Sequence, residues 1–142
     1  FDPTMIGSDG LPHDEFPHPR LWGTFPRILG HYCRDQGLFS LESAVHKMTG
    51  LTATEFVFPN RGVLREGAFA DITLFSAEEI QDRATFEEPT KRADGISTVI
   101  VNGVPVWTDS KSTGTRPGRV LRRAASQEQM ETTAPDAPLA VS

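Results

Sequence analysis

The chain has 142 residues, of which 37% are hydrophobic and 23% charged, and its formal net charge is −5. This composition is typical of a globular domain with a modest core, and the negative charge argues against nucleic-acid binding, which needs clustered Lys and Arg. The sequence contains no apolar run of the roughly 20 residues that a membrane helix requires. Cys33 is the single cysteine. An internal disulfide and a Cys-rich zinc cluster are therefore excluded, and a cytoplasmic setting is favoured.

The beginning of the chain predicts a piece of a larger fold. Its first residue is Phe1 rather than Met, and residues 4–8 have the pattern of the last part of a short buried strand. A long loop rich in Pro and His then extends to residue 23.

Residues 24 to about 59 are predicted to be helical. A first helix is capped by Thr24, has Pro26 in its first turn, and ends at Gly37. Its apolar positions have the i, i+3, i+4, i+7 spacing of one helix face and comprise Phe25, Ile28, Leu29 and Tyr32.

A second helix is predicted to start after Ser40 and to stop at Gly50. The residues on its apolar face are Leu41, Ala44, Val45 and Met48. The spacing of Thr52 and Glu55 is that of a capping box, which predicts a third, very short helix that ends before Pro59.

In residues 60–123 the apolar residues change to a period of two, and this segment is predicted to be mostly strands. Residues 62–75 suggest a strand, a Gly-containing turn and a second strand, in which Ala70, Ile72 and Leu74 share one face. Asn102-Gly103 separates two β-rich runs, 96–101 and 104–107, and favours a type I′ hairpin turn.

Pro105 restricts the second of these β-rich runs to an edge position, because proline cannot donate to a ladder. A last short strand is expected over 118–123. The polar tail 124–142 has no aromatic residue and is expected to be disordered.

Two residues near the start are candidates for chemistry. Asp9 follows the apolar segment directly, which is where active sites of α/β barrels lie, and its carboxylate could take a proton from a metal-bound water and return it to a leaving amine. It could instead only cap a turn. Arg20 could hold a carboxylate with its planar fork, or it could form an ordinary ion pair with Asp14 or Glu15.

Three further residues in this part of the chain are not expected to act chemically. His13 and His18 lack the helical spacing of paired metal ligands and are interpreted as surface or turn residues. Cys33 lies beside the apolar face of the first helix and is interpreted as a buried structural thiol rather than a nucleophile.

Several segments resemble a known family. Residues 62–75 match the pattern G-x-(I/V/L)-x-x-G-x-x-A-D-(I/L)-x-x-F, and residues 101–106 match a V-N-G-x-x-V hairpin. Both resemble the C-terminal part of amidohydrolases of the dihydroorotase-like, urease-like and D-aminoacylase-like groups. The segments 7–10, 18–27 and 113–122 narrow the resemblance to the D-aminoacylases, over roughly residues 3–123.

The resemblance implies a fold and a reaction. As a fragment the chain is of the α+β class: residues 1–59 are the last β/α unit of a (β/α)8 metal-dependent hydrolase barrel, and residues 60–123 contribute C-terminal strands of a small β-sandwich. The family hydrolyses N-acyl-D-amino acids with zinc. By resemblance, Asp9 is the residue that binds or neighbours the metal and shuttles the proton, and Arg20 grips the α-carboxylate of the substrate.

One departure from the family limits what this chain can do alone. The His-x-His pair, the metal-bridging Cys and the further His ligands of the family precede the last barrel strand and are not in these 142 residues. Because a catalytic zinc takes about three protein ligands, we expect the chain to need the N-terminal remainder of the barrel as a partner and to be inactive alone. Two other interpretations remain: a free-standing α+β module without catalysis, and a product of truncation or proteolysis.

Overall fold

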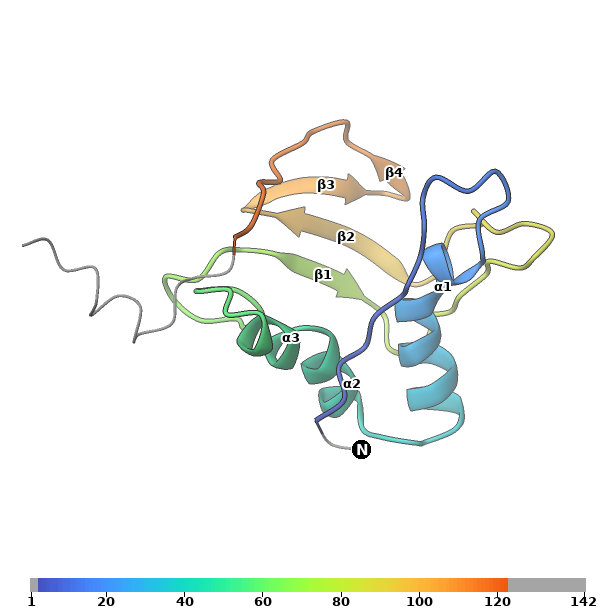
Figure 1. Ribbon diagram of the computed structural model, residues 1–142, viewed down its shortest axis with the longest axis horizontal. Coiled ribbons are helices and arrows are strands. Elements are labelled where there is room, and N and C mark those ends of the chain that lie inside the picture. The colour runs from blue at the N-terminus through green and yellow to red at the C-terminus, as the bar shows by residue number, and fades with distance from the viewer. Residues whose placement is uncertain (1–2, 123–142) are drawn as a thin grey trace, which may run out of the picture.

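The structure is a computed structural model that describes residues 3–122, with an antiparallel sheet and several helices (Figure 1). The strands β1 (Ile72–Phe75), β2 (Ile96–Val101), β3 (Val104–Thr108) and β4 (Lys111–Ser112) lie in the order β1-β2-β3-β4. Helices α2 and α3 lie on the β1 side of the sheet, and α1 lies beyond the end of β1. Within the described residues, no helix is long and apolar enough to cross a membrane.

The first helix begins earlier than predicted. Helix α1 spans Arg20–Arg27 and continues as the π-helical segment η1, Ile28–Asp35. Thr24 is therefore inside the helix, where its hydroxyl donates to the carbonyl of Arg20 at 2.8 Å. Pro26 is inside as well rather than in the first turn. Gly37, with φ +60°, follows the end of η1 as predicted.

Small residues make up much of the buried face of α1 and η1. The buried positions are Gly23, Pro26, Leu29 and Gly30, whereas Phe25, predicted to face the core, is 42% exposed. A Cβ atom on Gly30 would lie 2.4 Å from the carbonyl oxygen of Ile80. The helix therefore approaches the backbone of a later segment more closely than any larger residue would permit.

Helix α2 (Leu41–Met48) is confirmed with its cap, since the Ser40 hydroxyl accepts from the backbone N–H of Ser43 at 3.2 Å. Gly50 does not end a helix but begins α3, which spans Gly50–Glu55. The capping box predicted at Thr52 is wrong, because its hydroxyl donates to the carbonyl of Lys47.

The predicted hairpin is confirmed. Asn102 and Gly103 join β2 to β3, and both have positive φ values, 48° and 80°. Two consecutive left-handed residues are characteristic of a type I′ hairpin turn. Strand β4 pairs with Trp107 and Thr108 alone. Pro105 therefore lies at an edge, as its missing donor requires.

Three predicted strands are absent from the described residues, over 4–8, 62–65 and 118–122. A strand requires a neighbour for its backbone groups, and β1 to β4 pair only with one another within residues 3–122. In β1 the register shifts after Leu74, so Phe75 rather than Leu74 packs on the core. The tail 124–142 lies outside the described residues.

The two segments 62–75 and 101–106 meet at the hairpin turn. The carboxylate of Asp71 pairs with Arg61 and also accepts from the backbone N–H of Asn102 at 2.8 Å. The side chain of Asn102 accepts from Arg61 at 2.7 Å and donates to the carbonyl of Pro117 at 2.7 Å. These contacts attach the hairpin turn to the segments that precede and follow the sheet.

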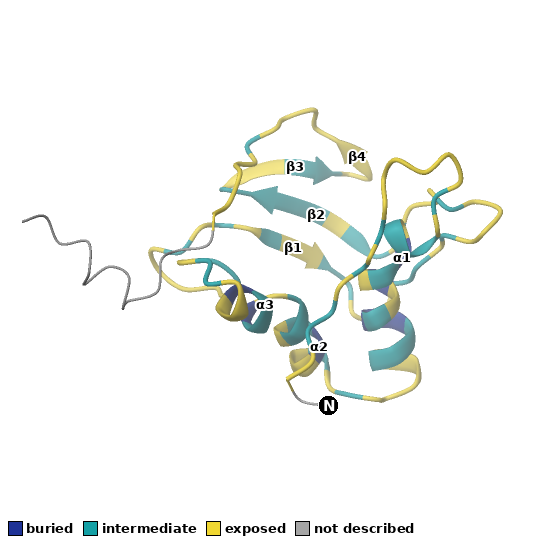
Figure 2. Ribbon diagram, in the orientation of Figure 1, coloured by how far each residue is buried: buried dark blue, intermediate teal, exposed yellow. Residues whose placement is uncertain are grey.

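The core is small. Among the described residues, the buried hydrophobic side chains are Leu29, Ala44, Ala53 and Ile80. Most of the ribbon in Figure 2 has the colours of intermediate or exposed residues. The partly buried hydrophobic residues around the core are Ile28, Cys33, Phe39, Leu41, Val45, Met48, Phe75 and Ile96. Burial raises the pKa of the Cys33 thiol, and Glu42 adds to this effect, which supports the interpretation of Cys33 as a structural thiol.

Candidate functional site

A strained turn presents Asp9 next to the start of α1. Asp9 has a φ of 49°, a left-handed conformation that Asp tolerates better than most residues. The hydroxyl of Ser8 accepts from the backbone N–H of Gly10 at 3.2 Å, and a Cβ on Gly10 would lie 2.7 Å from the backbone of Leu21. The turn is therefore closed by Ser8 and by close packing on α1.

The two candidate residues lie in direct contact. Arg20 Nη2 lies 2.8 Å from Asp9 Oδ2, with side chains that are 40% and 80% exposed. The sequence left open an ion pair of Arg20 with Asp14 or Glu15. In the structure the ion-pair partner of Arg20 is Asp9. The backbone N–H of Arg20 donates to His18 Nδ1 at 3.0 Å, which holds the loop against the first turn of α1.

The guanidinium of Arg20 is only partly satisfied. Its Nε is buried and has no hydrogen-bond partner within the described residues. Nε and Nη2 form one edge of the guanidinium, the edge with which arginine grips a carboxylate through two parallel bonds. Asp9 occupies Nη2 on this edge, while the buried Nε has no partner within the described residues.

The part of the chain that the structure describes has no group of three or more His, Cys, Asp and Glu side chains that could hold a metal ion. His13 is exposed, and His18 packs edge-to-face on Phe86 with ring centroids 4.9 Å apart. The residues present thus do not form a metal site by themselves. Asp9 is the single ligand that the resemblance implies here.

A cleft opens beside Arg20, between α1 and the segment 82–87. Its volume is about 380 Å³, within the range of small-molecule sites. Its lining residues are His18, Pro19, Arg20, Gly23, Thr24, Arg27, Asp82, Ala84, Thr85, Phe86 and Glu87. The sequence analysis missed this cleft, because no local pattern indicates that residues 82–87 pack against α1.

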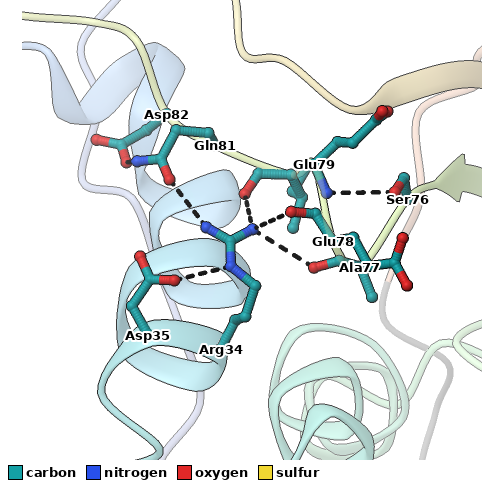
Figure 3. Close-up of polar contacts among 9 residues, drawn as sticks. Arg34, Asp35, Ser76, Ala77, Glu78, Glu79, Gln81 and Asp82 are labelled. Atoms are coloured by element: carbon teal, nitrogen blue, oxygen red, sulfur yellow. Dashed lines mark hydrogen bonds and ion pairs between the residues drawn. The ribbon is translucent and has the colours of Figure 1, made fainter.

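Arg34 fixes the segment that leads to this cleft (Figure 3). Its Nη1 donates to the backbone carbonyls of Ala77, Glu78 and Ile80 at 3.4, 3.0 and 2.8 Å. Its Nη2 donates to Gln81 Oε1 at 3.1 Å. One guanidinium on η1 thus ties a turn of backbone to the helix directly before Asp82, where the cleft wall begins.

We expect Arg34→Ala to loosen the segment 76–82, because three carbonyls lose a charged donor and each such bond contributes about 1.5–3 kcal/mol. Hydrogen exchange measured by mass spectrometry should show faster exchange for the peptides that cover residues 76–82, with a smaller change for Arg34→Lys. Arg65→Ala, which removes an exposed hydrogen bond to Asn60, is the control and should leave this exchange unchanged. Unchanged protection in Arg34→Ala would contradict the anchoring role.

Comparison with known proteins decides the family. The model of the amidohydrolase family matches residues 2–107. The chain belongs to the amidohydrolase family. It is 64% identical over 126 residues to a D-aminoacylase of Alcaligenes xylosoxydans xylosoxydans, which covers 89% of this chain and 26% of that relative. It is 52% identical over 122 residues to an N-acyl-D-glutamate deacylase of the same organism, which covers 86% of this chain and 25% of the relative.

Solved structures of similar proteins support the same family assignment. A D-aminoacylase structure, described for its binuclear metal centre, matches with a TM-score of 0.84 and 62% identity, over 86% of this chain and 26% of that one. An N-acyl-D-glutamate deacylase from Bordetella bronchiseptica, in complex with zinc and a phosphonate mimic of the tetrahedral intermediate, matches with a TM-score of 0.78 and 52% identity, over 84% and 25%.

These matches confirm the resemblance to the D-aminoacylases that the motifs indicated. The similar proteins are deacylases, and their structures carry metal centres. The chain spans about a quarter of the length of the relatives that it matches. For this amidohydrolase the observed architecture is a small antiparallel sheet with helices.

Proposed function

We propose that this amidohydrolase chain is part of a zinc-dependent N-acyl-D-amino-acid deacylase, to which it contributes Asp9 and Arg20. The observation that carries the proposal is their contact at 2.8 Å, with the second donor of the same guanidinium edge still unpaired. A base and an anion-binding group at this separation suit a substrate whose carboxylate is attached one carbon away from its scissile amide nitrogen.

In this proposal each residue has one task. Arg20, whose side chain is 40% exposed, binds the α-carboxylate through its guanidinium and so fixes the amide relative to Asp9. Asp9 accepts a proton from the attacking water and delivers it to the leaving amine, which releases a D-amino acid and a carboxylic acid. Zinc, when bound, polarises the amide carbonyl; Asp9 would be its ligand from this chain, and the other ligands would come from the rest of the protein.

The small core supports a larger fold around this chain. Many large hydrophobic side chains are exposed, among them Phe16, Leu64 and Phe86 at 85%, 78% and 75%, and such surface is normally covered in a folded protein. We therefore propose that residues 1–59 complete a (β/α)8 barrel made by an N-terminal remainder, and that residues 60–123 join a β-sandwich. We propose a cytoplasmic location for one reason, which is that Cys33 is the single cysteine of this sequence.

A direct assay tests the proposed activity. The full-length protein loaded with zinc should release D-methionine from N-acetyl-D-methionine and leave N-acetyl-L-methionine intact, as ninhydrin detection of the free amine would show. If neither this substrate nor other N-acyl-D-amino acids are hydrolysed by the zinc-loaded protein, the proposal is wrong and the alternative of a module without catalysis gains support.

For the isolated 142-residue chain we expect no stoichiometric zinc after dialysis and no turnover of N-acetyl-D-methionine, because residues 3–122 contain no group of three or more side chains that could hold a metal ion. Atomic absorption and the ninhydrin assay measure the two quantities. The zinc-loaded full-length protein is the positive control, and turnover by the pure chain would refute the prediction.

A further inference from the structure

We propose that Asn102 is a site of spontaneous deamidation, and that Arg61 protects it by fixing its side-chain amide in the folded protein. An asparagine that precedes a glycine is especially reactive in this way, because glycine has no Cβ to hinder the approach of its backbone nitrogen. Asn102-Gly103 is the only such pair in the sequence, since the other asparagine, Asn60, precedes Arg61. This chemistry belongs to the turn and is independent of the proposed deacylase function.

The reaction needs only the turn itself and water. The backbone nitrogen of Gly103 loses its proton and attacks Cγ of Asn102, and the new N–C bond closes a cyclic succinimide. The side-chain nitrogen leaves as ammonia, which takes up a proton in place of the one that Gly103 lost. Water then opens the ring at one or the other of its carbonyls and gives aspartate or isoaspartate.

Hydrogen bonds restrain both reacting groups. The side chain of Asn102 is held at both ends, because Oδ1 accepts from Arg61 Nη2 at 2.7 Å and Nδ2 donates to the carbonyl of Pro117 at 2.7 Å. The backbone N–H of Gly103 donates to the carbonyl of Ala70 at 2.9 Å. Rotation of Cγ toward the Gly103 nitrogen breaks the first two bonds, and loss of the Gly103 proton breaks the third. Attack therefore requires a local opening of the turn.

Arg61 provides the restraint on the Asn102 amide that comes from a side chain. It is itself firmly held, because it pairs with the carboxylate of Asp71 and its guanidinium lies 4.2 Å from the ring centroid of Phe69. Its side chain is only 11% exposed, so water competes little for its donors. Loss of this charged hydrogen bond should raise the open population of the turn, and with it the rate of deamidation, by about ten- to a hundredfold.

The product of the reaction would detach the hairpin turn. An aspartate at position 102 has no N–H to donate to the carbonyl of Pro117 and would compete with Asp71 for Arg61. An isoaspartate adds a methylene group to the main chain, which a two-residue turn cannot accommodate without losing its register. Protection by Arg61 thus preserves the attachment of the turn over the lifetime of the protein.

The experiment follows deamidation of the full-length protein during incubation at mildly alkaline pH, with peptide mapping by mass spectrometry to measure the fraction converted at Asn102. A synthetic peptide of residues 97–108 gives the rate without restraint, and we expect the unmodified protein to react at least about tenfold more slowly. Arg61→Ala should accelerate the reaction about tenfold or more. Arg92→Ala is the matched control, because Arg92 bonds the carbonyl of Ser110 and lies over Trp107 in the same sheet without contacting the turn.

Acceleration in Arg61→Ala but not in Arg92→Ala supports the proposal. Equal acceleration in both variants would mean that any loosening of the sheet exposes Asn102, and it would overturn the role of Arg61. Slower deamidation in Arg61→Ala would also overturn it, since Arg61 would then activate the amide carbonyl toward attack. Equal rates for the unmodified protein and the peptide would reject protection altogether. If circular dichroism shows that Arg61→Ala does not fold, Arg61→Lys replaces it, with the same direction expected at a smaller size.

Discussion

Asp9→Asn in the full-length protein should lower kcat for N-acyl-D-amino acids by about 10²–10⁴-fold, the usual cost of losing a general base. The amide has nearly the same shape as the carboxylate but cannot accept the proton. Asn also tolerates the left-handed backbone of this turn, where φ is 49°. The loss should therefore arise from chemistry rather than from backbone strain, and steady-state kinetics with N-acetyl-D-methionine measures it.

Two controls make the Asp9 result interpretable. Circular dichroism of Asp9→Asn should match that of the unmodified protein. Asp14→Asn removes an exposed carboxylate from the same loop and should leave kcat unchanged. If Asp9→Asn retained more than about a tenth of the activity, a proton-transfer role would be excluded.

Arg20→Lys should lower kcat/KM by roughly ten- to a hundredfold, mainly through KM, because a hydrogen bond to a charged group contributes about 1.5–3 kcal/mol. An ammonium group keeps the charge but cannot form two parallel bonds with a carboxylate. Kinetics with N-acetyl-D-methionine measures the effect. Arg65→Lys, at an exposed hydrogen bond to Asn60, is the matched control and should behave like the unmodified protein.

A second substrate distinguishes carboxylate binding from a purely structural role of the Arg20–Asp9 pair. If Arg20 grips the substrate carboxylate, the penalty of Arg20→Lys should largely disappear for an N-acyl amine without that group. An equal penalty for both substrates would mean that Arg20 only positions Asp9 and its loop.

The sequence by itself determined the features that depend on local chemistry. The positive φ angles that Asn102-Gly103 readily adopts were enough to predict the hairpin, and Ser40 with the apolar spacing after it was enough to predict α2. The ordered motifs also placed the chain among the amidohydrolases, as the match over residues 2–107 confirms. Asp9 and Arg20 could be named as candidates from residue type and position alone.

Only the tertiary structure decided the features that depend on distant partners. The contact of Arg20 with Asp9 rather than Asp14 or Glu15 follows from the way Gly10 packs on the first turn of α1. The buried face of α1 could not be predicted from hydrophobic spacing, because close approach of the Ile80 backbone requires Gly30 rather than a large side chain. One wall of the cleft beside Arg20 directly follows a segment that Arg34 holds from more than 40 residues away in sequence, and no local pattern encodes such a contact.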